Sequence, residues 1–177
     1  LPYILVIQHP VTTEHTSAGT QILETIEALY RRKEQIVILC PNIDDGSDAL
    51  SAVLRRHPLA KREGVQTFKH LSPSALFANV LRNAACIVGN SSSGIRETCY
   101  FGTPAVNVGS RQNGRERGSN VIDTPYDRNA IYDAIERQIA HGLYEPEYLY
   151  GDGTAGKRLT EICASYELPN IQKKIQY

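Results

Sequence analysis

Short runs of Ile, Val and Leu alternate with segments of helical periodicity along the chain, and this alternation constrains the fold more than any other feature. Apolar runs typical of buried strands occur at 3–9, 36–40, 65–68, 85–89, 104–108 and 120–123. Segments with helical spacing lie at 19–32, 47–57, 72–84, 93–100, 127–140 and 155–166. Such alternation predicts a parallel sheet covered by helices on both faces. We therefore expect an α/β fold, a Rossmann-like three-layer α/β/α domain with about six parallel strands.

Size and composition exclude several classes of protein. A chain of 177 residues can form one domain with a full core, and no repeat or long linker divides it, so 1–177 is expected to be a single domain. The formal net charge is zero, which argues against a nucleic-acid partner. No apolar run approaches the roughly 20 residues that a membrane helix needs. We expect neither nucleic acid nor a membrane as a partner.

The cysteine pattern indicates a reduced, cytoplasmic protein without a metal site. None of the four cysteines forms a CxxC pair, and the histidines are not at ligand spacing. The stretch PNIDDGSD lacks the spacing of a calcium loop. No GxGxxG follows the first strand, which argues against NAD. We expect no metal and no cofactor.

Three predicted helices carry residues suited to cap their first turns. Ser47 and Asp127 stand at the starts of two of them, where a side-chain oxygen can accept a backbone hydrogen bond. Ser72 is expected to cap a third, with Pro73 at its first helical position.

Ligands of parallel sheets bind outside the carboxyl ends of the strands, so a ligand of this chain is expected to contact the loops after the strands. The loop that carries VGNSSSGIRE places Ser91 and Ser92 before a predicted helix, where hydroxyls and free N–H groups favour a phosphate. Gly94 would let the backbone approach the ligand, and Glu97, one turn further on, would suit ribose hydroxyls. The alternative is a serine-capped helix that Glu97 stabilises through the helix dipole.

Other loops carry weaker signals of the same kind. His9 ends the first strand and could bind a diphosphate or transfer a proton, or it could simply bond to backbone. Asn42 could contact a ligand at the end of its strand. The alternative is that its loop is a simple turn that leads into a helix. Arg111, in GSRQNGRERG, has the planar fork that suits phosphate, or it is solvated surface charge. Together these groups favour a nucleotide site.

Several stretches occur together in an order that resembles a known family. They are QHPVTTE, PNIDDGS, KHLSP, GNSSSGIRE, FGTPAVNVGSRQNGRERGSNVI and YGDGTAGKR. Along nearly its whole length the chain resembles the C-terminal half of the UDP-N-acetylglucosamine 2-epimerase family. The resemblance implies one half of a glycosyltransferase-B architecture, in which two Rossmann-like domains enclose the active site. This chain would be the nucleotide-binding domain, without the amino-terminal domain; the absence of Met from the sequence agrees with a piece of a longer protein.

The stretch His9–Thr13, His-Pro-Val-Thr-Thr, resembles the hydrolysing branch, which converts UDP-N-acetylglucosamine and water to N-acetylmannosamine and UDP for sialic acid or related nonulosonic acid synthesis. Related enzymes act on UDP-diacetamido-bacillosamine or a GDP-sugar, and the residues do not choose among these substrates. The alternatives are the non-hydrolysing branch, the nucleotide-sugar half of a glycosyltransferase-B enzyme, and a non-catalytic module that binds a nucleotide sugar.

The resemblance also implies a role for each candidate residue. His9 would lie beside the diphosphate and take part in leaving-group chemistry. Ser91 and Ser92 would hold the diphosphate, Glu97 the ribose hydroxyls and Leu71 the uracil through its backbone, while Asn42 and Arg111 would line the nucleotide pocket. UDP would leave with loss of the C2 proton, and water would then add to the resulting 2-acetamidoglucal. The carboxylates that move the proton belong to the amino-terminal domain, so this chain alone is expected to bind UDP or a UDP-sugar without turnover. The full-length form is expected to be a homo-oligomer.

Overall fold

Six parallel strands form one sheet in the computed structural model, which describes residues 2–167. The strands are β1 (Tyr3–Ile7), β2 (Gln35–Leu39), β3 (Val65–Phe68), β4 (Cys86–Gly89), β5 (Ala105–Val108) and β6 (Val121–Thr124). Their order is β3-β2-β1-β4-β5-β6, and each neighbouring pair is parallel. The chain reverses its direction of travel across the sheet between β1 and β4. Open α/β sheets bind ligands at such a switch point.

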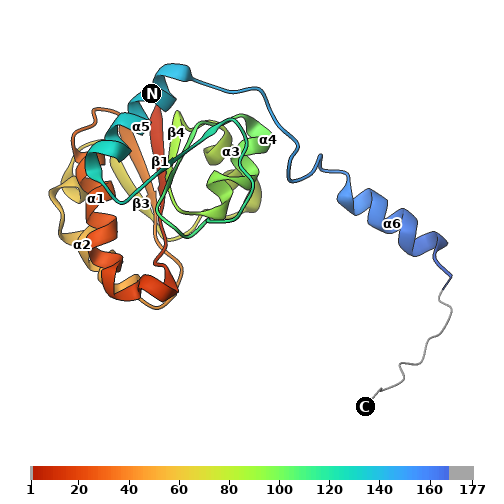
Figure 1. Cartoon of the computed structure of the whole chain (residues 1–177), viewed down its shortest axis with the longest axis horizontal. Coiled ribbons are helices and arrows are strands. Elements are labelled where there is room, and N and C mark those ends of the chain that lie inside the picture. Colours follow the sequence, from red (N-terminus) through yellow and green to blue (C-terminus); the bar gives the residue numbers. More distant parts are fainter. Residues whose placement is uncertain (1, 168–177) are drawn as a thin grey trace, which may run out of the picture.

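Helices cover both faces of the sheet. They are α1 (Ala18–Tyr30), α2 (Ser47–Arg56), α3 (Ser74–Arg82), α4 (Arg96–Phe101), α5 (Arg128–His141) and α6 (Ala155–Ser165), with short 3₁₀ turns η1 (Thr12–Ser17), η2 (Pro58–Lys61) and η3 (Ser92–Gly94). Figure 1 shows α1, α2 and α5 on one side of the sheet and α3 and α4 on the other. The predicted three-layer α/β/α fold is therefore confirmed.

Alternate residues of β1 supply the two halves of the core. Ile4 and Val6 pack in one cluster with side chains of α1, α2 and α5. Leu5 and Ile7 pack in the other cluster with Leu81 of α3. Complete burial of each such side chain contributes roughly 1.5–3 kcal/mol to folding. These contacts hold the parallel strands in register. The carboxyl ends of β1, β2 and β4 therefore lie next to one another at one edge of the sheet.

The helix starts agree with the sequence in part. The Asp127 carboxylate accepts two backbone hydrogen bonds from the first turn of α5, as predicted. The expected cap at Ser47 is wrong, because Gly46 is the N-cap of α2 and the Ser47 side chain makes no capping bond. The expected cap at Ser72 is also wrong. Pro73 has extended backbone and is itself the N-cap, so α3 begins only after it.

Helix α6 stands apart from the sheet (Figure 1). None of its residues is buried, and the apolar side chains of Leu159 and Ile162 are exposed. The site described below is thus formed by the loops of the sheet and without this helix. No helix within residues 2–167 combines the length and the apolar character that crossing a membrane requires.

Candidate functional site

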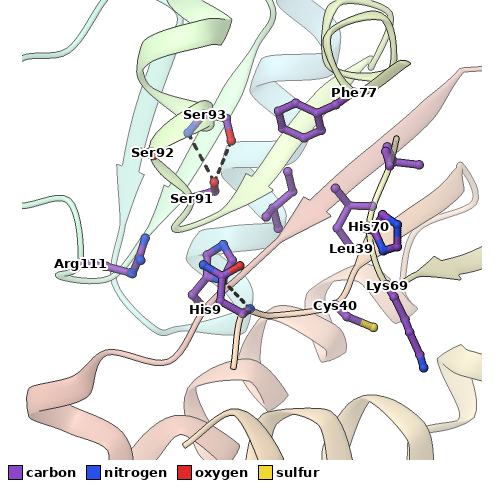
Figure 2. Close-up of a pocket in the computed structure, with 13 residues that line it drawn as sticks. His9, Leu39, Cys40, Lys69, His70, Phe77, Ser91, Ser92, Ser93 and Arg111 are labelled. Atoms are coloured by element: carbon purple, nitrogen blue, oxygen red, sulfur yellow. Dashed lines mark hydrogen bonds between the residues drawn. The ribbon is translucent and has the colours of Figure 1, made fainter. Parts of the chain in front are cut away.

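A cavity of about 360 Å³ opens at the carboxyl edge of the sheet, where β1, β2, β3 and β4 end. Figure 2 shows the side chains around it. The lining residues are Ile7, His9, Leu39, Cys40, Asn42, Lys69, His70, Leu71, Phe77, Ser91, Ser92, Ser93 and Arg111. Every candidate residue from the sequence except Glu97 lies among them. The structure therefore brings together residues that are up to a hundred positions apart in the chain.

The serine loop leaves β4 at a point that requires glycine. Gly89 has a φ of +134°, and a Cβ atom there would lie 2.1 Å from the carbonyl oxygen of Ile7. The backbones of the β1 and β4 loops can approach so closely because Gly89 has no side chain. Gly94 has no positive φ, and a Cβ there would make ordinary contacts with Ile87. Its expected close approach to a ligand stays a prediction.

The serines lie in a turn rather than at the start of a long helix. Residues 92–94 form η3, and α4 begins only at Arg96 and has six residues. A helix this short adds little dipole field, so hydroxyls and backbone N–H groups are the main donors here. The Ser91 and Ser93 hydroxyls are 2.7 Å apart and hydrogen-bonded to each other, and the Ser93 N–H also points at the Ser91 hydroxyl.

Asn90 joins the serine loop to the loop after β1. Its side-chain oxygen accepts a hydrogen bond from the His9 N–H at 2.7 Å, and its amide donates to the His9 carbonyl at 2.8 Å. Asn90 is completely buried, so both bonds are shielded from water. This reciprocal pair fixes the position of His9 relative to the serines.

The His9 ring is held in one orientation at the mouth of the cavity. Its Nδ1 atom accepts a hydrogen bond from the Asn42 N–H at 3.2 Å. The neutral ring therefore carries its proton on Nε2 and can donate it to a ligand. Burial, aided by the positive charge of Arg111, lowers the pKa of His9 below its ordinary value, and the Asp44 carboxylate opposes this shift. His9 is thus a neutral hydrogen-bond donor near pH 7.

Arg111 reaches the cavity from the loop after β5. Its Nη1 atom donates to the Asn90 carbonyl at 3.2 Å, and the buried Gln112 amide donates to the same oxygen at 2.7 Å. Gln112 alone would keep that carbonyl paired, so the Arg111 guanidinium has further donors for a ligand.

The cavity has an apolar end and a polar end, and we call it the acid-free cavity. Phe77 and Leu39 lie on the side of the cavity away from Arg111 (Figure 2), and we call this side the apolar end, while the serines, His9 and Arg111 form the polar end. Among the described residues that line it there is no Asp or Glu, whereas Lys69 and Arg111 bring positive charge. Such a cavity suits a flat apolar ring joined to an anion such as a diphosphate.

Glu97 lies outside this cavity. It begins the first turn of α4 and lines a separate hollow of about 170 Å³ with Arg96, Tyr100, Glu147, Tyr150 and Gly151. Its exposed carboxylate accepts no hydrogen bond from the residues that the structure describes. Its predicted contact with ribose stays a prediction.

Several lining residues were not predicted from the sequence. Lys69 and His70 belong to a loop after a strand, and this position was the signal that could have indicated them. Phe77 reaches the cavity from α3, and no sequence pattern indicated this position. Asn90 was part of the quoted serine stretch, but its role as a clamp depends on contact with a residue 81 positions away.

Comparison with known proteins identifies the family of the chain. The family described as UDP-N-acetylglucosamine 2-epimerase matches residues 1–164. A UDP-N,N'-diacetylbacillosamine 2-epimerase (hydrolyzing) of Legionella pneumophila is 36% identical over 168 residues, which cover 93% of this chain and 43% of the relative. A UDP-N-acetylglucosamine 2-epimerase of Neisseria meningitidis serogroup B is 29% identical over 172 residues, covering 96% of this chain and 45% of the relative.

Solved structures show the same fold. The UDP-GlcNAc 2-epimerase of Methanocaldococcus jannaschii, in complex with UDP-GlcNAc and UDP, superposes with a TM-score of 0.67 at 14% identity, over 92% of this chain and 45% of that one. The enzyme of Neisseria meningitidis bound to UDP-GlcNAc gives the same TM-score and identity, over 93% and 45%. The chain therefore spans less than half the length of these relatives. These matches do not support the expectation that the chain is the C-terminal half of a longer epimerase.

Proposed function

The chain belongs to the UDP-N-acetylglucosamine 2-epimerase family, and from this premise we propose that it is the domain of a hydrolysing 2-epimerase that binds the UDP part of a nucleotide sugar. The observation that carries the proposal is the acid-free cavity, in which Ser91, Ser92, His9 and Arg111 meet at the switch point of the sheet. These are donors for a diphosphate, and the apolar end beside them suits a base.

The proposed ligand lies along the cavity. The uracil occupies the apolar end, where it meets the backbone at Leu71, and Asn42 lies near the nucleotide. The serine hydroxyls and Arg111 bind the diphosphate. Glu97 binds the ribose hydroxyls from the first turn of α4, which follows the serine loop directly. In this arrangement the sugar carbon that reacts lies beyond the second phosphate, on the side of His9 and Arg111.

The chemical role of this domain is to stabilise the leaving group. As the C1–O bond of the sugar breaks, negative charge grows on the UDP oxygen that departs. The proposed donors to that oxygen are the Nε2–H group of His9, the serines and Arg111. Asn90 and Asn42 hold His9 in place, and Arg111 is bonded to the Asn90 carbonyl. Donors fixed in advance lower the barrier because they need not reorganise as charge develops. We propose His9 as the catalytic residue of this chain.

The whole reaction requires a second domain. We propose that the longer protein removes UDP from UDP-N-acetylglucosamine with loss of the C2 proton, and then adds water to release N-acetylmannosamine for sialic acid or related nonulosonic acid synthesis. The His-Pro-Val-Thr-Thr stretch and the hydrolyzing relative at 36% identity support the hydrolysing reaction, and that relative also makes UDP-N,N'-diacetylbacillosamine an alternative substrate. The groups that move the C2 proton come from the other domain, and the full-length protein is a homo-oligomer.

The first test is calorimetric titration of the chain with UDP, with GDP and NAD as controls. We expect UDP to bind, GDP to bind more weakly and NAD not to bind. Ser92→Ala should weaken UDP about tenfold, because a hydrogen bond to a charged group is lost. Ser165→Ala, on exposed α6, should change nothing. Absence of UDP binding, or an unchanged Ser92→Ala variant, contradicts the proposal, and release of N-acetylmannosamine by the chain alone contradicts the role given to a second domain.

A further inference from the structure

A second cavity, of about 510 Å³, adjoins the acid-free cavity. Its lining residues are Pro10, Val11, Thr12, Thr13, Glu14, Asp44, Ser110 and Arg111. We call it the acid-lined cavity, after Glu14 and Asp44. Among the described residues, Arg111 is the one that lines both cavities. The two cavities therefore meet at the guanidinium group that the proposed function assigns to the diphosphate.

The two cavities select opposite kinds of ligand. Carboxylates repel a diphosphate, whose charge has the same sign, and an ionised carboxylate can only accept hydrogen bonds. The acid-lined cavity therefore favours a neutral group that donates several hydrogen bonds. The hydroxyl and amide N–H groups of a sugar are donors of this kind. Thr12, Thr13 and Ser110 add hydroxyls that can both donate and accept.

Glu14 is already oriented by neighbouring side chains. One carboxylate oxygen accepts from the Ser110 hydroxyl, and the other accepts from the Gln21 amide at 2.7 Å. A carboxylate has about four acceptor positions, so two remain for a ligand. The side chain of Glu14 is half-buried, which strengthens each hydrogen bond that it accepts.

Asp44 lines the same cavity. It belongs to the loop between β2 and α2, far in sequence from Glu14. It is half-buried and near enough to His9 to affect that ring electrostatically. Pro10 and Val11 add apolar surface to the lining of this cavity. A lining that combines carboxylate acceptors with a small apolar surface matches a pyranose ring, which has polar edges and an apolar C–H face.

We propose that the acid-lined cavity binds the sugar ring of the nucleotide sugar, a neutral 2-acetamido hexose, and that Glu14 and Asp44 accept hydrogen bonds from its hydroxyl or amide groups. This inference rests on the proposed function, because a diphosphate at Arg111 places the sugar on the far side of that residue from the base. Base, diphosphate and sugar then follow one another along the edge of the sheet.

The experiment compares two ligands on matched variants. Calorimetry with UDP and with UDP-N-acetylglucosamine gives the ratio of the two dissociation constants for the wild-type chain and for Glu14→Gln, Asp44→Asn and Asp45→Asn. Asp45 is a neighbouring, exposed acid outside the cavity, so its variant controls for the loss of charge. We expect Glu14→Gln and Asp44→Asn to weaken the nucleotide sugar about tenfold relative to UDP, and Asp45→Asn to leave the ratio unchanged.

The ratio separates the two proposals. If the wild-type chain binds UDP but the ratio stays the same in both Glu14→Gln and Asp44→Asn, the sugar site is wrong and the nucleotide site stands. An equal loss of both ligands in a folded variant also leaves the ratio unchanged and has the same meaning. If the wild-type chain does not bind UDP, the proposed function is wrong and the sugar site with it. Thermal unfolding of each variant confirms that it is folded.

Discussion

The acid-free and acid-lined cavities share an edge of the sheet and one arginine, yet they differ in charge. The first has serines, His9 and Lys69 around an apolar end, and the second has Glu14 and Asp44 around a small apolar surface. Loops after β1, β2 and β5 contribute to both cavities, so the sheet itself does not set this difference. Residues a few positions apart on one loop, such as His9 and Glu14, therefore line cavities of different charge, and we propose that they bind different parts of one ligand.

The largest expected effect is at the residue shared by the two cavities. Arg111→Ala should weaken UDP and UDP-N-acetylglucosamine alike, by about 100-fold, because charge-assisted bonds to the diphosphate are lost. The fold should survive, since Gln112 still donates to the Asn90 carbonyl. Calorimetry measures the loss, and Arg115→Ala, on the exposed part of the same loop, is the control. If Arg111→Ala lowers the affinity for just one of the two ligands, Arg111 does not contact the diphosphate that both ligands share.

Glu97 tests how far the nucleotide extends beyond the acid-free cavity. Glu97→Ala should weaken UDP about tenfold, because the carboxylate no longer accepts hydrogen bonds from the ribose hydroxyls. The wild-type chain should prefer UDP to 2′,3′-dideoxy-UDP, and the variant should lose this preference. If the wild-type chain and the variant prefer UDP to the dideoxy analogue equally, Glu97 does not bind the ribose and only lines the small hollow beside Tyr150.

The pH dependence at His9 should be a smaller effect. Its pKa is lowered in the folded chain, so the unfolded state binds more protons just below the ordinary value of 6.5. The free energy of unfolding should therefore fall as the pH drops through that region, and less so in His9→Gln. A bound diphosphate favours the protonated ring, so the affinity of the wild-type chain for UDP should rise over the same interval relative to His9→Gln. Denaturant titrations and calorimetry at several pH values measure both trends; parallel curves for the two proteins would contradict the role of His9.

Cys40 provides the smallest expected effect and a sensitive reporter. It is half-buried and lines the acid-free cavity. In a Cys163→Ser background, which removes the exposed thiol, a thiol reagent should label Cys40 slowly, and UDP should slow the labelling further. Cys40→Ser should abolish the labelling while changing the affinity for UDP by less than about twofold. If UDP does not slow the labelling of Cys40, the nucleotide does not bind next to the end of β2.

Much of the fold follows from local patterns in the sequence. The alternation of apolar runs with helical segments predicts the layers, because a strand buried on both faces and an amphipathic helix differ in period. Strand ends were less predictable: the run through His9 appears continuous, but β1 ends at Ile7, and the next residues turn toward Asn90 and Asn42. Those contacts join distant segments, and no local pattern encodes them.

The two cavities also differ in how far the sequence predicts them. The serine stretch concentrates several donors within a few residues, so it points to a phosphate site or to a serine-capped helix. Glu14 and Asp44 come from separate loops, and each appears as an ordinary acid near the start of a helix. Only the folded chain brings both to one cavity with Arg111. Glu97 illustrates the reverse case, since its position in the sequence indicates the site but its side chain lies outside the cavity.

A crystal structure of the chain with UDP-N-acetylglucosamine tests the division between the two cavities most directly. The account predicts the diphosphate among Ser91, Ser92, His9 and Arg111, and the sugar ring beside Glu14 and Asp44. A sugar ring at the apolar end near Phe77, or a diphosphate next to Glu14, would contradict it.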